Sequence, residues 1–215
     1  MEKKANVKKA LVITGGYCDT EGLGHPDAGD YDLVIAADSG LDTAEKLGIQ
    51  ADIIVGDFDS LGRVPGDRVT EKEAQVIQLP CEKDVTDTMF ACSCAAERGC
   101  REITILGGTG GRADHTLSNV FYLESLRERG IRAEIADGRN RIRLAVDETV
   151  TITNDGGYFS VFALDSCIVS ARGCKYPTRE LRLLRKEPFA VSNEVKGKRA
   201  YVKVEGKAVL ITSKK

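Results

Sequence analysis

The sequence predicts an α/β domain built on a parallel sheet, followed by an antiparallel β-sandwich. In the first part of the chain, short apolar runs alternate with segments of helical pattern, and glycine or aspartate follows most of these runs. Strand, helix and strand at this spacing form a βαβ unit, whose two strands are parallel. From about Arg139 the helical periodicity disappears, and short apolar or alternating runs separated by turn residues take over. We therefore expect two domains, residues 1–138 and 139–215.

The strands of the first domain are expected where apolar residues are continuous, because strands buried on both faces carry such runs. Each helix is expected to end at a glycine, which readily adopts the left-handed conformation that follows a helix. The expected strands are 10–13, 33–37, 53–55, 76–79, 103–106 and 133–136; the expected helices run through 41–47, about 88–98, and from beyond His115 to about Arg129, and they stop at Gly48, Gly99 and Gly130.

The second domain is expected to hold short strands without helices between them, which is the pattern of an antiparallel sandwich. Turn residues separate the strands, notably at 154–157 and at Glu205-Gly206. The expected strands are 149–153, 158–163, 167–170, 201–205 and 208–211.

Composition excludes several classes of partner. The 215 residues carry a formal net charge of -2, so we expect no nucleic-acid partner and no anionic membrane surface. The seven cysteines form no C-x-x-C pair, and we expect them to be reduced and mostly buried. The longest N-terminal apolar run, residues 10–13, is too short for a signal peptide or a membrane span. These features predict a soluble, cytoplasmic protein.

Two carboxylates directly after the third strand indicate a metal site. Asp57 and Asp59 are two residues apart, at the strand end where open parallel sheets bind ligands. Neighbouring anions repel each other unless a cation lies between them, and Mg²⁺ prefers carboxylate oxygens together with substrate phosphates. Asp38 is a further carboxylate at a strand end. An ordinary turn is the alternative, because aspartate, glycine and serine are common turn residues.

A second acidic pair lies where the helix at about 88–98 begins. Asp84 and Asp87 are three residues apart, so they share one face as the helix starts, and Lys83 lies beside them. Helix capping is the alternative, because acidic side chains suit helix N-termini. Two acids and a lysine after a strand exceed what one cap requires, so we expect them at the same site.

A glycine-rich loop follows the fifth strand and precedes a helix. Four of the residues 107–111 are glycine, and Arg112, Asp114 and His115 follow them. Backbone N–H groups of such a loop can face an anion, and a guanidinium matches phosphate oxygens. The loop lacks the Gly-Lys-Ser/Thr ending of a Walker A motif, and a flexible linker is the alternative. We interpret it as an anion-binding loop that includes Gly110 and Gly111.

In the second domain, Ser192, Asn193 and Glu194 lie between two valines. This polar trio is either a turn or a row of hydrogen-bonding groups for a small polar ligand. The acids, the glycine-rich loop and the arginine together predict metal-assisted chemistry on a nucleotide polyphosphate.

Five motifs in this order resemble those of the bacterial type of thiamine pyrophosphokinase, also called thiamine diphosphokinase. The resemblance extends over nearly the whole chain, and it rests on the order of the motifs, since each one alone is weak. The motifs are Asp38-Ser39-Gly40, Gly56-Asp57-Phe58-Asp59-Ser60, Lys83-Asp84-x-Thr86-Asp87, Gly107-Gly108-x-Gly110-Gly111-Arg112-x-Asp114-His115 and Ser192-Asn193-Glu194.

The resemblance implies a Rossmann-like catalytic domain that binds ATP and Mg²⁺, followed by a β-sandwich that binds thiamine and forms a homodimer. It implies the reaction ATP + thiamine → AMP + thiamine diphosphate, at sites where two subunits meet. Transferred to this chain, the resemblance implies four catalytic residues, Asp57, Asp59, Asp84 and Asp87, of which Asp57, Asp59 and Asp87 are the metal ligands. It implies that ATP is bound by Asp38, Lys83, Gly110, Gly111, Arg112 and Asp114. The implied thiamine contacts are Ser192 and Asn193.

Three questions stay open at this point. The acceptor's proton could go to Asp84, to Asp57 or to no base at all. A Mg²⁺-dependent phosphohydrolase with Asp57 as nucleophile is an alternative enzyme, and a thiamine or nucleotide sensor is a non-enzymatic one. In addition, Pro177-Thr178 stands where the family pattern favours a more apolar continuation of the strand. The path of the strand at these two residues is therefore open, whereas the chemistry is not affected.

Overall fold

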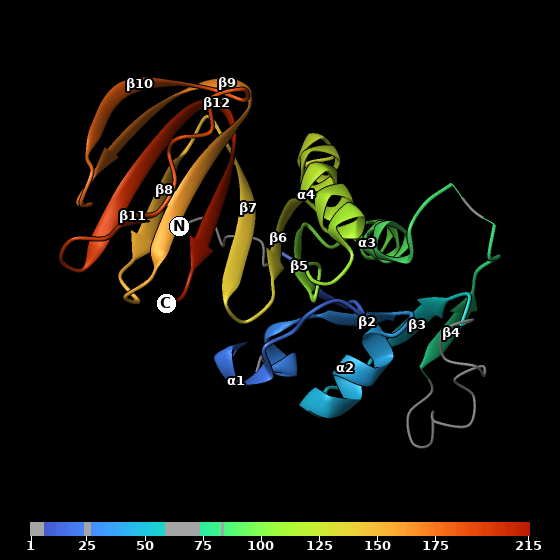
Figure 1. The fold of residues 1–215 in the computed structure, drawn as a ribbon. Coiled ribbons are helices and arrows are strands. Elements are labelled where there is room, and N and C mark those ends of the chain that lie inside the picture. The colour runs from blue at the N-terminus through green and yellow to red at the C-terminus, as the bar shows by residue number, and fades with distance from the viewer. Residues whose placement is uncertain (1–6, 24–26, 59–73, 83) are drawn as a thin grey trace, which may run out of the picture. The chain divides into compact units, whose positions relative to one another are not determined.

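The structure is a computed structural model that describes residues 7–23, 27–58, 74–82 and 84–215. The chain forms two compact units, Met1–Gly138 and Arg139–Lys215 (Figure 1). Asp59, Ser60 and Lys83 lie outside the described residues, so the expectations for them have no structural counterpart.

The first unit is built on a sheet of six parallel strands. Its order is β6-β5-β1-β2-β3-β4, and every pairing is parallel. From the central β1, the chain adds β2, β3 and β4 on one side and then β5 and β6 on the other. The strands are β1 (Lys9–Ile13), β2 (Leu33–Ala37), β3 (Ile53–Gly56), β4 (Gln75–Gln78), β5 (Glu102–Leu106) and β6 (Arg132–Ala136).

Helices cover both faces of this sheet (Figure 1). In the picture, α2 (Gly40–Leu47) lies on one face, and α3 (Asp87–Glu97) and α4 (Ala113–Glu128) lie on the other. The expected stop at Gly48 is confirmed, since this residue caps α2 in the left-handed conformation. Two short elements, α1 (Thr20–Leu23) and a 3₁₀ turn at Ala28–Asp30, connect β1 to β2.

The core of the first unit lies between the central strands and the helices. Leu11 and Ile13 on β1 and Ile103 and Ile105 on β5 are at most 2% exposed. Their continuous burial explains the apolar runs from which these strands were predicted. No helix in the described part of the chain is long and apolar enough to cross a membrane.

The second unit consists of antiparallel strands. Its order is β10-β9-β12-β7, with β11 paired to β9 and β8 paired to β12. Its side chains enclose a separate core that includes Val161, Val169, Val202 and Val204. The predicted fold class, a parallel α/β sheet followed by an antiparallel sandwich, is confirmed. The strands are β7 (Asn140–Val146), β8 (Thr149–Thr153), β9 (Tyr158–Arg172), β10 (Thr178–Leu184), β11 (Asn193–Glu194) and β12 (Arg199–Ser213).

The long strands β9 and β12 correct the sequence prediction. Residues 158–163 and 167–170 belong to one strand, and so do 201–205 and 208–211. The predicted turn at Glu205-Gly206 is wrong, because the pairing of β12 with β9 shifts register between Gly206 and Ala208 and then continues. This irregularity resembles a β-bulge, in which glycine takes a positive φ without steric cost, here 98°.

The cysteines are confirmed as free thiols. Cys92, Cys94, Cys100, Cys167 and Cys174 are buried. Burial raises the pKa of Cys92 to about 12, so this thiol stays protonated and behaves as a small apolar side chain.

Candidate functional site

A cavity of about 380 Å³ opens at the carboxyl ends of β1, β2 and β5. After β1 the chain continues to β2, toward one edge of the sheet, and after β5 it continues to β6, toward the other edge. The strand order thus reverses direction between β1 and β5, and ligands of open α/β sheets bind at such a switch point. The cavity is lined by Thr14, Gly15, Gly16, Ala37, Asp38, Ser39, Thr86, Asp87, Thr88, Gly107, Gly108, Thr109, Gly111, Arg112, His115, Thr116 and Asn119.

The loops after β1 and β5 are bound to each other at the cavity wall. The Tyr17 N–H donates to the carbonyl oxygen of Thr109 at 2.7 Å. A Cβ on Gly16 would lie 2.1 Å from the carbonyl oxygen of Gly107 and 2.2 Å from that of Thr109. Only glycine allows this approach, so Gly16 lets the loops after β1 and β5 pack closely against each other.

Three helices begin at the cavity and contribute partial positive charge to its wall. Ser39 precedes α2, Thr86 caps α3, and Arg112 precedes α4. The Thr86 hydroxyl accepts the Met89 N–H at 3.2 Å, which fixes the start of α3. Helix N-termini carry partial positive charge and unpaired N–H groups. The cavity is therefore suited to an anion such as a phosphate.

Two of the predicted acids, Asp38 and Asp87, line the cavity together. The Asp38 N–H donates to Val55 at 2.7 Å across the β2–β3 pair, and its φ is +47°, a left-handed value. Asp87 is the first residue of α3. Of the other predicted acids, Asp57 is partly buried and Asp84 is exposed, and both lie outside the cavity lining.

The donor chemistry of these acids fits Mg²⁺, which is usually held by one or two carboxylates together with substrate phosphates. Within residues 7–23, 27–58, 74–82 and 84–215, no group of three histidine, cysteine or acidic side chains could hold a metal ion. Asp59, which the sequence places in the predicted metal site, belongs to none of these ranges. Of the predicted acidic cluster, the structure describes Asp38, Asp57, Asp84 and Asp87, and of these Asp38 and Asp87 line the cavity.

The predicted arginine, Arg112, lines the cavity and forms a two-point ion pair with Asp114. Its Nε lies 3.1 Å from one carboxylate oxygen and its terminal nitrogen 2.6 Å from the other. The hydrogen bond to Arg112 lowers the pKa of the Asp114 carboxyl well below its usual range, and the same contact raises the pKa of Arg112. Both side chains are exposed, so this pair can exchange Asp114 for another oxyanion at little cost.

The predicted thiamine contacts lie in the second unit and differ in their surroundings. Ser192 is exposed and takes a left-handed φ of +57°. The side-chain oxygen of Asn193 accepts the N–H groups of Tyr176 at 3.1 Å and of Glu194 at 2.9 Å. Its side-chain nitrogen donates to the Tyr176 carbonyl at 2.8 Å. The Asn193 amide thus holds the Tyr176 backbone at two points.

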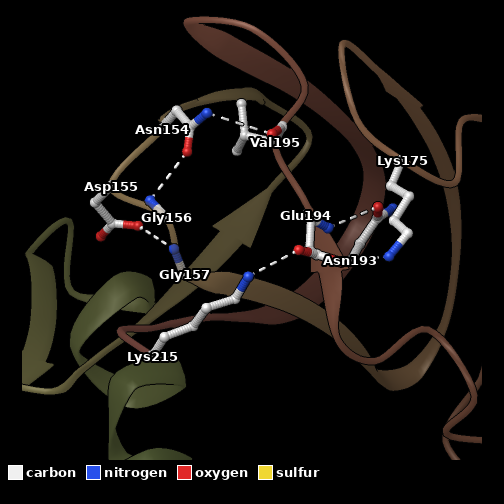
Figure 2. A network of polar contacts seen from close by, with 9 residues as sticks. All are labelled: Asn154, Asp155, Gly156, Gly157, Lys175, Asn193, Glu194, Val195 and Lys215. Carbon is white, nitrogen blue, oxygen red and sulfur yellow. Dashed lines mark hydrogen bonds and ion pairs between the residues drawn. The ribbon is translucent and has the colours of Figure 1, made fainter.

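The neighbouring Glu194 is held between two lysines. Figure 2 shows these three residues and Asn193. Its carboxylate oxygens lie 2.6 Å from the nitrogen of Lys175 and 3.0 Å from that of Lys215. These contacts lower the pKa of the Glu194 carboxyl. They fix the short strand β11 to the segment before β10 and to the end of the chain, and so place Ser192 on an anchored segment.

Several cavity residues were not predicted from the sequence. Most are small hydroxyl residues. Ser39 and Thr86 stand in the motifs that resemble the family, although no role was assigned to them, and for the others the only signal is their place near a predicted strand end or helix start. The cavity residues in question are Thr14, Ser39, Thr86, Thr88, Thr109, Thr116 and Asn119.

Comparisons with known proteins identify the family. The family model for the catalytic domain of thiamin pyrophosphokinase matches residues 28–135. Thiamine pyrophosphokinase of Bacillus subtilis is 31% identical over 171 residues, which cover 77% of this chain and 79% of that protein. The chain belongs to the thiamine pyrophosphokinase family.

Solved structures of the thiamine pyrophosphokinase family share the whole fold. The crystal structure of the Bacillus subtilis enzyme matches with a TM-score of 0.83 at 28% identity, covering 97% of this chain and 100% of that one. A family protein from Enterococcus faecalis matches with a TM-score of 0.82 at 28% identity, covering 97% and 99%. The predicted family and the predicted enzyme class, a diphosphokinase, are confirmed. The family model includes Asp38, Asp87 and the loop after β5, whereas Ser192 lies beyond it.

Proposed function

We propose that this enzyme transfers a diphosphate group from ATP to thiamine, giving thiamine diphosphate and AMP, with Mg²⁺ held by the aspartates. Family membership supports the acceptor and the transferred group. The observation that carries the proposal is the cavity at the switch point, where a glycine-rich loop and three helix starts face two carboxylates. An anion site and a cation site in one cavity suit a metal-bound polyphosphate, because each charge there meets its opposite.

The polyphosphate side is formed by the loop after β5. The N–H groups of Gly110 and Gly111 and the Arg112 guanidinium bind phosphate oxygens, and Lys83 adds a further positive charge. Arg112 leaves Asp114 and turns its fork to the phosphates, while the freed Asp114 lies on the ATP side of the site. Diphosphoryl transfer needs little covalent help from the protein, so these groups act by orienting the polyphosphate and neutralising its charge.

The acidic side is formed by Asp57, Asp59 and Asp87, which would hold Mg²⁺, with Asp38 close by. When bound, Mg²⁺ neutralises the polyphosphate oxygens that the carboxylates would otherwise repel. Asp84 or Asp57 takes the proton of the thiamine hydroxyl if a base is needed. With a loose transition state the proton leaves late and a base contributes little, so a flat rate from about pH 6.5 to 9 would favour its absence.

Thiamine is bound from the second unit, by the exposed Ser192 hydroxyl and the segment that Asn193 shapes. We propose a homodimer in which the sandwich of one subunit completes the acidic site of the other, in the cytoplasm. The test is complementation: Asp59→Asn is mixed with the double variant Ser192→Ala, Asn193→Ala under conditions of demonstrated subunit exchange. Mixed dimers hold one site with both intact halves, so activity should return. Exchange without any return of activity would place the whole site within one chain.

The reaction is tested by incubating the purified enzyme with ATP, thiamine and Mg²⁺ and separating the products. AMP and thiamine diphosphate should form in equal amounts, and Asp87→Asn should lower both together because one metal-binding carboxylate is lost. A phosphohydrolase would instead release inorganic phosphate without thiamine, and a sensor would bind its ligand without forming AMP. Either result refutes the proposal.

A further inference from the structure

The buried polar side chains of the described residues converge on one loop. Only Thr14, Thr88, Asn119 and Asp137 are polar or charged and less than 9% exposed in this part of the chain. Three of them hydrogen-bond to consecutive residues of the loop after β5, and the fourth, Thr88, lines the same cavity. Buried polar groups are costly unless they are paired, so their concentration around one loop points to a function of that loop.

Two of the contacts orient carbonyl groups. The Thr14 hydroxyl, at the end of β1, donates to the carbonyl oxygen of Gly107 at 2.5 Å. The Asn119 side-chain nitrogen, on α4, donates to the carbonyl oxygen of Gly108 at 2.9 Å. Both oxygens are thereby held by donors of the protein. A free carbonyl oxygen turned toward a phosphate would repel it, and these two donors prevent that orientation.

The third contact involves a charge. The Thr109 hydroxyl donates to a carboxylate oxygen of Asp137 at 2.6 Å. Asp137 directly follows β6, is 2% exposed and lies outside the cavity lining, so it cannot itself meet the ligand. A hydrogen bond to an ionised group is stronger than one between neutral groups. Asp137 therefore fixes the Thr109 side chain, and this contact restricts the backbone of the adjacent Gly110 and Gly111.

We infer that Thr14, Asn119 and above all Asp137 are positioning residues that hold the loop after β5 ready to receive a polyphosphate. The anchored residues 107–109 leave the next N–H groups, those of Gly110 and Gly111, without an acceptor in the described protein. Donors fixed before the ligand arrives need no reorganisation when it binds, which strengthens binding and catalysis. The inference rests on the proposed function, because it takes ATP as the ligand of this loop.

The test measures ATP binding by calorimetry and steady-state kinetics in matched variants. Thr109→Val removes the hydroxyl and should weaken ATP affinity about tenfold or more and lower kcat. Thr109→Ser keeps the hydroxyl and should restore most of the affinity. Because Thr109 also lines the cavity, Asp137→Asn is measured alone and combined with Thr109→Val. If the hydroxyl acts through Asp137, the double variant resembles Thr109→Val, whereas independent effects would multiply.

A ligand-free measurement separates this inference from the proposed function. Amide hydrogen exchange across residues 107–112 should be faster in Thr109→Val than in the wild type and in Thr109→Ser, while Ile131→Val, a core change elsewhere, leaves it unchanged. A wild type that binds no ATP would refute the proposed function and is recognised before any variant is compared. Unchanged ATP affinity and exchange in Thr109→Val, equal loss in Thr109→Ser, or multiplying effects would each overturn the positioning role. If Asp137→Asn does not fold, the comparison of Thr109→Val with Thr109→Ser still tests the positioning role.

Discussion

Replacing Gly16 by alanine should damage the site through the backbone alone. The new Cβ would lie 2.1 Å from the carbonyl oxygen of Gly107 and 2.2 Å from that of Thr109, and real Cβ contacts hardly ever fall below 3.0 Å. The two oxygens would have to recede by about 0.9 and 0.8 Å to reach that limit. Neither can rotate away as a side chain would, and the Thr109 oxygen also accepts the Tyr17 N–H at 2.7 Å.

The size of the effect follows from this displacement. Overpacking a tight backbone contact costs about 1–3 kcal/mol of unfolding free energy. A domain of this length loses roughly 2–4 °C in Tm for each kcal/mol, so we expect Tm to fall by about 2–12 °C. A shift of about 1 Å in a substrate-positioning loop can lower turnover about a hundredfold, so kcat/KM should fall on that scale.

The assay compares Gly16→Ala with Gly111→Ala, which lies in the neighbouring loop. A Cβ at Gly111 would meet nothing within 4 Å, so its thermal unfolding curve should match the wild type. Unfolding is followed by circular dichroism, and turnover by the formation of AMP. A Gly16→Ala enzyme with wild-type Tm and wild-type kcat/KM would refute the reasoning, because it would mean that the two loops are not packed as the structure shows.

Three further predictions follow from single side chains. Arg112→Lys keeps the charge and loses the planar fork, so kcat/KM should drop about tenfold without a change in Tm, because the side chain is exposed; equal activity would place it outside the site. Ser192→Ala should raise the KM for thiamine several-fold and leave the KM for ATP unchanged, and a shift in both would contradict a thiamine contact. The lysine contacts lower the pKa of Glu194 from 4.5, so they stabilise the protein above about that pH and are lost as the pH falls through the lower native value. The Tm difference between wild type and Glu194→Gln should therefore shrink in acid, and a constant difference would refute the linkage.

The parallel half of the fold was predictable because its signals are local. Continuous apolar runs such as residues 10–13 and 103–106 mark strands buried on both faces, and a glycine stops α2 where expected. Because the carboxyl ends of parallel strands meet at one edge, the residues after those runs were expected together. Asp38, Asp87 and most of the loop after β5 line one cavity, whereas Asp57 and Asp84 lie outside its lining.

The sandwich was less predictable because its strands follow long-range pairing. β9 and β12 each extend over 15 residues and bind different partners along their length, so a sequence window sees several short runs. Gly206 resembles a hairpin turn in the sequence, yet the chain continues, with the Gly206 N–H bound to Asp147 at 2.7 Å. β7 was missed because arginines alternate with its apolar residues, at Arg141 and Arg143.

The two Ala-Asp pairs at strand ends show where local inference stops. Asp38 follows β2 and Asp137 follows β6, and both come after an alanine that ends a parallel strand. Strand order gives them opposite roles, because β2 lies beside β1 at the switch point whereas β6 lies beyond β5. Asp38 consequently faces the cavity, while Asp137 is buried and bound to Thr109. A carboxylate at a strand end thus predicts the edge of the sheet on which it lies, but only the tertiary structure determines whether it meets the ligand or holds the loop that does.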